Sequence, residues 1–174
     1  MIKDKKLVAF FAGFSAFIAV FENFIPLPFP FLRLGFSNIP IMLGLNIFNF
    51  FEFSFIVLFK TVFSHLFRGT LFSVPFLIGI SGAILFIIFL YPTYKLFKNY
   101  ISFISAGILG AFFHNTGQIL VALLFIPLKP VLFFGNILII FGTIFGLITG
   151  IICNILYNKN ILRIFYGSKT LSKN

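Results

Sequence analysis

The residues best suited to chemistry stand close together in one apolar stretch, in the sequence AFFHNTGQ. His114 and Gln118 are four residues apart, and Asn115 and Gln118 are three apart, so on a helix all three share one face. Polar groups at bilayer depth are costly unless they are paired or line a wet cavity, which makes them functional candidates. The pattern predicts either a ligand pocket, in which these groups orient a bound molecule, or a hydrogen-bonded cluster that only holds helices together.

A second candidate set is charged and lies around a proline-rich stretch. Arg33 stands within that stretch, and Arg68 lies at the outer end of the third apolar run. The planar guanidinium group suits carboxylate and phosphate groups, so the two arginines predict an anionic or electron-rich ligand. In this hypothesis Glu22 and the loop through Asn38 form a lid over the ligand. The alternative is that Glu22 pairs with one arginine and pins the loop.

Two more polar residues in the third apolar run are given lesser roles. Lys60 shares a helix face with Arg68, and its long side chain is expected to extend to the cytoplasmic interface rather than to a ligand. His65 lies off that face. Neither is placed in the predicted ligand site.

The sequence lacks the residue sets of several catalytic classes. Asp4, Glu22 and Glu52 are its three carboxylates, too few and too dispersed to hold Mg²⁺ against a diphosphate. Cys153 is its single cysteine, and no spacing typical of a zinc site occurs. A G-x-x-x-x-G-K-S/T motif for nucleotide binding is missing. We therefore expect no metal, no cofactor and no catalysis by this chain alone.

The elements that must position these groups are membrane helices. Hydrophobic residues make up 60% of the 174 residues, charged residues 9%, and mean hydropathy is +1.15, whereas soluble domains carry about 25% charged residues. At about 20 residues per span, an all-α polytopic bundle of six transmembrane helices is predicted, in a single membrane domain, 1–174. The predicted spans are about 7–25, 39–51, 53–70, 74–92, 101–126 and 131–157, and a basic cytoplasmic tail follows at 158–174.

The positions of the basic residues predict the orientation of the bundle. Nine of the 13 Lys and Arg lie before the first apolar run, between the fourth and fifth runs, or in the tail. With both termini cytoplasmic, all of these fall inside, as the positive-inside rule requires. The formal charge of +10 therefore indicates topology and attraction to an anionic lipid bilayer, and no nucleic-acid partner is expected.

The second span is short for a membrane crossing. At about 1.5 Å per residue it covers only about 20 Å of a hydrocarbon core near 30 Å. The preceding proline-rich loop is therefore expected to enter the membrane, which is tolerated where protein shields the loop or where it lines a cavity.

Small residues recur at the spacing that lets membrane helices pack closely. Ala12 and Ala16 lie in the first run, and Gly142, Gly146 and Gly150 lie in the last. Such faces pack within a chain or dock onto a membrane partner. The first run is the better candidate for docking.

Three blocks of sequence resemble a known family: ENFIPLPFPFLRLGFSNIPIMLGL at 22–45, RGTLFSVPFLIGISG at 68–82 and GILGAFFHNTGQILVA at 107–122. They are similar to the signature blocks of the bacterial family named heptaprenyl diphosphate synthase component I, also called the Gx transporter family, over about residues 7–157. This family is grouped with the substrate-binding S components of energy-coupling-factor (ECF) vitamin transporters. The resemblance implies a six-helix bundle in the bacterial cytoplasmic membrane, with both termini inside and a pocket open to the outside.

The resemblance also implies partners. The small-residue face of the first helix, represented by Ala12 and Ala16, would dock a transmembrane coupling subunit that two cytoplasmic ATPases drive. The missing nucleotide motif agrees with ATP hydrolysis by partners. Some relatives are associated with flavin-dependent or quinone-linked electron export, which suggests a flavin- or isoprenoid-related ligand.

The main hypothesis is a membrane-embedded substrate-binding subunit for small-molecule uptake, energised by partner subunits. In it Arg33 and Arg68 neutralise ligand charge, while His114, Asn115 and Gln118 orient the ligand. The alternative is an accessory membrane subunit of isoprenoid or quinone metabolism, or of flavin- or quinone-linked electron export. A third hypothesis, a proton-coupled carrier acting alone, lacks a carboxylate at mid-membrane, although His114 could relay protons.

Overall fold

Every regular element described in the computed structural model is a helix, which confirms the all-α class for residues 5–25 and 34–159, the part of the chain that the structure describes. The elements in chain order are α1 (Lys5–Glu22), α2 (Asn38–Gly44), α3 (Phe50–Phe67), α4 (Val74–Leu85), η1 (Phe86–Leu90), α5 (Tyr91–Leu96), α6 (Phe103–Phe125) and α7 (Leu128–Asn158). Because α4, η1 and α5 continue as one helix, the described residues form six helical units. The basic tail predicted for 158–174 lies almost entirely outside the described residues.

Four of the described helices are long and apolar enough to cross a membrane: α3, the continuous helix Val74–Leu96, α6 and α7. α1 is as long as α3, with 18 residues. It differs from α3 in that it begins with two lysines and ends with a glutamate. α2 has seven residues, which at about 1.5 Å per residue cover about a third of a 30 Å hydrocarbon core. Four of the six predicted spans are therefore supported in a multi-pass protein. The second span, which the sequence predicts to be short, is shorter still, and α1 is not among the four.

The largest boundary difference lies between α2 and α3. The sequence pattern predicts a helix over 39–51, but α2 ends at Gly44 and a turn precedes α3. Asn49 caps α3, because its Oδ1 accepts from the backbone N–H of Glu52 at 2.9 Å while the Glu52 carboxylate accepts from the Asn49 N–H at 3.0 Å. This reciprocal cap satisfies N–H groups that a helix start leaves open, so α3 begins at Phe50 rather than at 53.

The fourth predicted span, 74–92, continues to Leu96 through a wide turn. Phe86–Leu90 forms a π turn directly before Pro92. A proline inside a regular helix removes one hydrogen bond and clashes with the carbonyl four residues earlier. Because the π turn changes the hydrogen-bond pattern at that carbonyl, the helix continues past Pro92.

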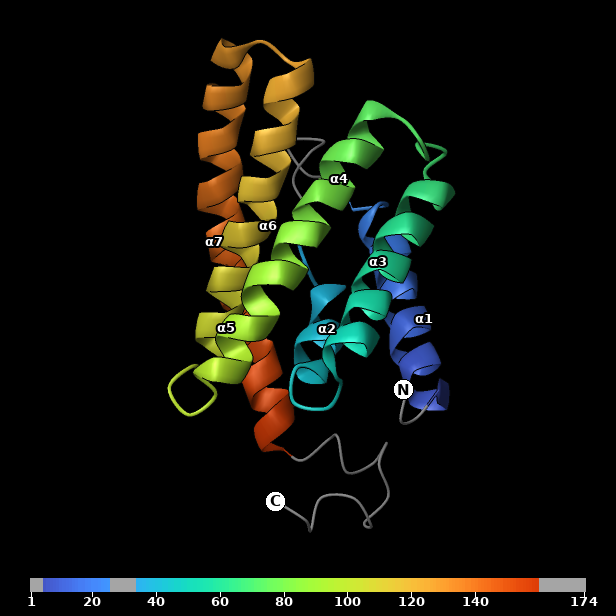
Figure 1. Ribbon diagram of the computed structural model, residues 1–174, viewed down its shortest axis with the longest axis vertical. Helices are drawn as coiled ribbons and strands as arrows, with labels where there is room; N and C mark the ends of the chain where they lie inside the picture. Colours follow the sequence, from blue (N-terminus) through green and yellow to red (C-terminus); the bar gives the residue numbers. More distant parts are fainter. Residues whose placement is uncertain (1–4, 26–33, 160–174) are drawn as a thin grey trace.

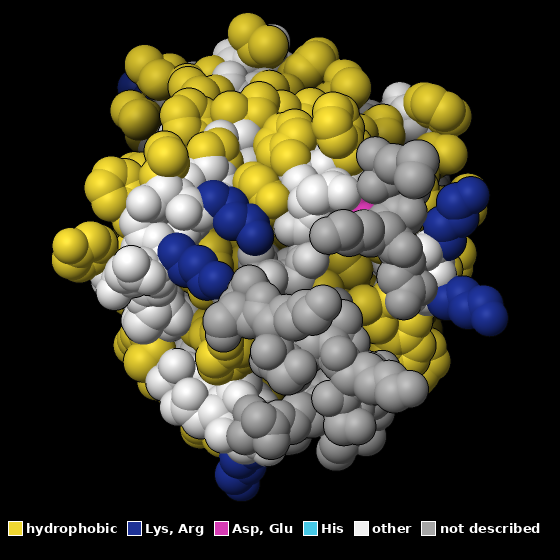
Figure 2. Space-filling view, turned by 60° about the horizontal axis from the view of Figure 1, so that its bottom comes forward, with side chains coloured by type: hydrophobic (Ala, Val, Ile, Leu, Met, Phe, Trp, Pro, Cys, Tyr) yellow, Lys and Arg dark blue, Asp and Glu magenta, His cyan; other side chains and the backbone are white. Residues whose placement is uncertain are grey.

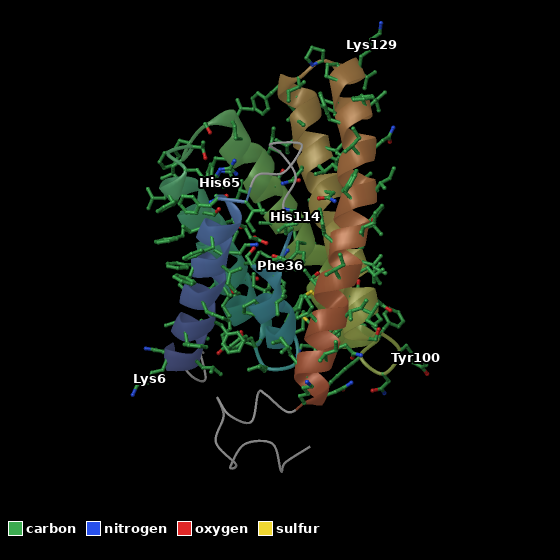
Figure 3. All side chains as sticks on the ribbon, turned by 180° about the vertical axis from the view of Figure 1, so that it is seen from behind. Lys6, Phe36, His65, Tyr100, His114 and Lys129 are labelled. Atoms are coloured by element: carbon green, nitrogen blue, oxygen red, sulfur yellow. The ribbon has the colours of Figure 1, made fainter. Side chains whose placement is uncertain are left out.

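The helices alternate in direction, and the start of α1 and the end of α7 lie at the same end of the bundle (Figure 1). α6 packs along α7 and against α4, α1 packs along α3, and α2 contacts α1, α3 and α7. Lys6 and Tyr100 lie at the end of the bundle where α1 begins and α7 ends, and Lys129 lies at the opposite end (Figure 3). Lys and Arg side chains surround the first of these ends (Figure 2). This arrangement agrees with the predicted topology, in which both termini share one side.

The predicted small-residue faces are used for packing within the chain. Gly146 lies against Gly107, and Gly150 lies against the backbone of α6, so that α6 and α7 approach closely. Ala12 and Ala16 are each 2% exposed and lie in the interior. Docking of a partner through these two alanines stays a prediction, and it requires a packed face to become accessible.

Large apolar side chains are exposed along the outside of the bundle. Examples on different helices are Phe14, Phe55, Ile88, Leu124 and Ile140. A soluble protein rarely exposes contiguous apolar surface on this scale, whereas lipid chains solvate it. The surface therefore supports placement of the bundle in a bilayer.

Candidate functional site

A polar cavity lies inside the apolar bundle, between the start of α2 and parts of α3, α6 and α7. Its volume of about 80 Å³ holds a few water molecules or one compact chemical group. His65 and His114 lie in the interior between the helices (Figure 3). The polar side chains that line the cavity are Ser37, Asn38, Lys60, Thr61, His65, His114, Asn115, Gln118 and Thr149.

Lys60 is the cationic side chain of this cavity. It is 7% exposed, and its Nζ donates to Asn38 Oδ1 at 2.7 Å. The expectation that Lys60 extends to the cytoplasmic interface is therefore wrong. The physical reason is α2: because this short helix begins inside the bundle, it brings an amide oxygen to the middle of α3, and the ammonium group finds a partner there.

Glu22 positions the chain segment that enters α2. Its Oε1 accepts from the Phe36 N–H at 2.5 Å, and its Oε2 accepts from Ser37 Oγ at 2.8 Å. Both residues directly precede Asn38, so the end of α1 pins the entry to α2. The pairing of Glu22 with an arginine stays a prediction. The partners described for Glu22 are a backbone N–H and a hydroxyl group, and its side chain lines neither cavity.

The polar set of α6 both joins helices and lines the polar cavity. Asn115 Nδ2 donates to the Leu138 carbonyl of α7 at 2.8 Å, which is a bond between helices. Asn115, His114 and Gln118 also line the polar cavity. The His114 ring stands edge-on to Phe86, with the ring centroids 6.4 Å apart. One member of the set therefore holds helices together while all three face the cavity.

Two glycines make room for these side chains. A Cβ on Gly142 would collide with the Asn115 amide, and a Cβ on Gly82 would lie 3.0 Å from the His114 ring. Gly142 belongs to the small-residue repeat of α7, so part of that repeat serves the polar site as well as helix packing.

His65 stands at the edge of the cavity. Its Nδ1 lies 2.9 Å from Thr70 Oγ1, and its ring is edge-on to Phe76 at 5.5 Å between centroids. A Cβ on Gly79 would collide with its Nε2. The imidazole is therefore confined between α3 and α4, at a position for which the sequence predicts no ligand role.

An apolar groove adjoins the polar cavity. It has a volume of about 390 Å³ and lies between the end of α3, the start of α4, the last turns of α6 and the first turns of α7. His65, Gly79, Gln118 and Leu138 line both the groove and the cavity. Arg68, which is exposed, lines the groove but not the polar cavity.

The structure divides the predicted ligand-binding residues between these two spaces. Arg68 lies at the groove and not in the polar cavity, Glu22 lies outside both, and Arg33 lies outside the described residues. The residues that it brings together in the polar cavity are Asn38, His114, Asn115 and Gln118. Their roles toward a ligand stay predictions.

The polar residues of α3 are visible in the sequence, but the prediction places none of them except Arg68 in the site. Lys60, Thr61, Ser64 and His65 are all buried. Their spacing, two adjacent residues followed by two more one turn later, places them on one side of a helix. The pattern is the signal for this buried face, from which the exposed Arg68 is excluded. Within the described residues, no group of three or more His, Cys, Asp or Glu is arranged to hold a metal ion.

These features define a class: an all-α membrane protein whose apolar helices enclose a polar cavity beside an apolar groove. Residues 11–156 match the family described as heptaprenyl diphosphate synthase component I, and the chain belongs to this family. No curated protein and no solved structure shows significant similarity to the chain.

Proposed function

We propose that this chain is a membrane-embedded binding subunit of isoprenoid metabolism, which holds a small molecule for a partner protein and is not itself catalytic. The observation that carries the proposal is the polar cavity, where Lys60 and several hydrogen-bonding side chains are buried in an apolar bundle. Ionisable and polar groups at membrane depth are costly and mark functional sites by default. Membership of the heptaprenyl diphosphate synthase component I family supports the isoprenoid context.

The residues at the site favour binding over catalysis. Among the described residues, the linings of the cavity and groove contain no Asp or Glu. Prenyl transfer from a diphosphate uses Mg²⁺, which carboxylate oxygens hold. In this proposal the carboxylates belong to a soluble prenyltransferase partner.

The first experiment identifies the ligand. The full chain is purified from native membranes, and bound compounds are extracted and analysed by mass spectrometry. We expect one compound to be enriched, and His114→Ala and Arg68→Ala to lower its retention. Leu132→Ala, at a side chain that is 55% exposed and lines neither space, is the matched control. If neither site variant lowers retention, the assignment of the pocket is wrong.

The second experiment identifies the partner. Crosslinking in intact cells and recovery of the full chain should yield a soluble prenyltransferase. A flavin- or quinone-modifying protein would instead assign the chain to electron export. Recovery of neither, with an isoprenoid still bound, would contradict the accessory role while leaving binding intact.

A second candidate function is small-molecule uptake as an ECF-type S component. The observation that favours it is that the groove, with Arg68, is formed by the end of α3, the start of α4, the end of α6 and the start of α7. These helix ends lie opposite the start of α1 and the end of α7 (Figure 1), on the side that the charge distribution assigns to the outside. Crosslinking to a transmembrane coupling subunit and its ATPases would support uptake. Uptake that persists without any ATPase would favour a carrier acting alone.

A further inference from the structure

We infer that the ligand is a single-chain amphiphile, with a compact anionic head group in the polar cavity and an apolar chain in the adjoining groove. The inference rests on the proposed function and adds the chemical class of the ligand. It depends on the continuity of the two spaces, on their charge, and on their sizes.

The two spaces form one site with a polar end and an apolar end. His65, Gly79, Gln118 and Leu138 line both, so a molecule that fills one space contacts the boundary of the other. Beyond this boundary most of the side chains that line the groove are apolar, such as Ile119, and the exposed Arg68 lies where the groove meets the end of α3. A ligand that satisfies the whole site must therefore change from polar to apolar along its length.

The charge of the polar end selects an anion. Lys60 lies there, and the described residues that line the polar cavity include no Asp or Glu. Hydrogen bonds between charged groups are roughly twice as strong as those between neutral groups, so an anionic oxygen near Lys60 is favoured. Gln118 and Asn38 add amide groups that fix the orientation of a head group.

The volumes of the two spaces indicate which part of the ligand each space can hold. The polar cavity, at about 80 Å³, accommodates a carboxylate or a phosphate monoester rather than a larger head group. The groove, at about 390 Å³, lies in the range of about 300–1,000 Å³ typical of small-molecule sites. Its rim is accessible, since Phe134 is 40% exposed, so the chain of the ligand has a path out of the protein.

The inference is tested with the full chain in nanodiscs of zwitterionic lipid and four probes. Farnesyl phosphate and dodecanoate are anionic amphiphiles, farnesol has the chain without the charge, and inorganic phosphate has the charge without the chain. Binding is followed by native mass spectrometry and by the temperature at which Cys153, which is fully buried, becomes reactive to a thiol reagent. We expect at least one anionic amphiphile to bind about tenfold more tightly than farnesol, a difference of about 1.4 kcal/mol, and inorganic phosphate to have no effect.

Variants locate the two parts of the ligand. Ala122→Phe fills the groove and should weaken binding of the anionic amphiphile, whereas Leu120→Phe, at a lipid-facing residue of the same helix, should not. Lys60→Gln should remove the preference over farnesol. Where Lys60→Gln does not fold, the comparison of probes on the unmodified chain and the Ala122→Phe result decide the question.

The outcomes distinguish this inference from the proposed function. If farnesol binds as tightly as both anionic amphiphiles, the ligand does not need an anionic head group. If inorganic phosphate binds as tightly as the amphiphiles, the ligand does not need an apolar chain. Either result would contradict the inference. If a compound is retained from native membranes but no amphiphile binds, the ligand class is wrong and the binding function stands. If no compound is retained and no probe binds, both are wrong.

Discussion

The ammonium group of Lys60 and the amide oxygen of Asn38 lie 2.7 Å apart, which joins the middle of α3 to the first residue of α2. On the other side of the same segment, Glu22 of α1 accepts hydrogen bonds from Phe36 and Ser37. Two charged side chains from two different helices therefore hold one short stretch of backbone. This stretch forms part of the wall of the polar cavity, so the same contacts that stabilise α2 also shape the site.

Asn38→Ala should destabilise the protein more than substitution of an exposed asparagine. The variant removes the acceptor of a buried ammonium group, and hydrogen bonds to charged groups contribute about 1.5–3 kcal/mol. We expect a loss of that size in the free energy of unfolding, measured in mild detergent by denaturant titration. Asn158→Ala, at an exposed residue, is the control, and equal losses in the two variants would contradict the role of the Lys60 contact.

Gly142→Ala should disturb Asn115. The new Cβ collides with the Asn115 amide and displaces it from the Leu138 carbonyl. Because the two residues are in contact, we expect Gly142→Ala and Asn115→Ala to be non-additive in a double-mutant cycle by more than about 0.5 kcal/mol. Gly13→Ala, where the added carbon meets open space, is the matched control. An additive cycle would show that the two positions do not interact.

Glu22→Ala should loosen α2 without unfolding the bundle. Cys153 of α7 is fully buried, and its Sγ lies 3.6 Å from the Ile39 carbonyl of α2. Release of the segment before α2 should therefore raise the rate at which a membrane-permeant maleimide labels Cys153, by about tenfold for a loss of about 1.4 kcal/mol in local stability. Ser54→Ala, which removes an exposed hydrogen bond within α3, should leave the labelling rate unchanged.

Gly79→Ala should alter the boundary between the cavity and the groove. The added carbon collides with the His65 imidazole, which lines both spaces. We expect the folded variant to retain less of the native compound, because the displaced ring narrows the passage. Substituting His65→Ala in the same chain removes the collision and should restore part of the retention. Unchanged retention in a folded Gly79→Ala protein would place the ligand elsewhere.

The long helices could be predicted from the sequence because their signal is local. Apolar runs long enough for a membrane identify α3, α4 with its continuation, α6 and α7 within a few residues. The pair Asn49 and Glu52 is a capping sequence that could have corrected the start of α3. The end of α2 is less clearly marked. Gly44 and Asn46 are residue types that often end helices, but Leu45, Ile47 and Phe48 continue the apolar pattern, and only the tertiary structure shows that the chain turns there.

The candidate site was predicted in part, for a similar reason. Asn115 and Gln118 were identified because polar residues are conspicuous in an apolar helix, and their three-residue spacing is visible in the chain. The location of Lys60 depends on Asn38, 22 residues earlier, on a helix whose position no periodicity reveals. The side chain of an isolated lysine in an apolar run is expected to extend to the aqueous interface unless the fold supplies a hydrogen-bond acceptor. Here Asn38 supplies that acceptor.

The π turn at Phe86–Leu90 keeps the buried faces of α4 and α5 on the same side of one continuous helix, although the two halves contact different neighbours. Gly82, Phe86, Leu90 and Tyr94 are all buried, one every four residues. In a regular helix of 3.6 residues per turn, the first and last of these would diverge by about 120° around the axis. The wide turn absorbs that rotation, so Gly82 still faces α6 while the Tyr94 hydroxyl donates to Asn46 at 3.2 Å. In effect the helix carries one extra residue as a phase correction, and deletion of a single residue there would rotate the tyrosine end away from the turn that follows α2.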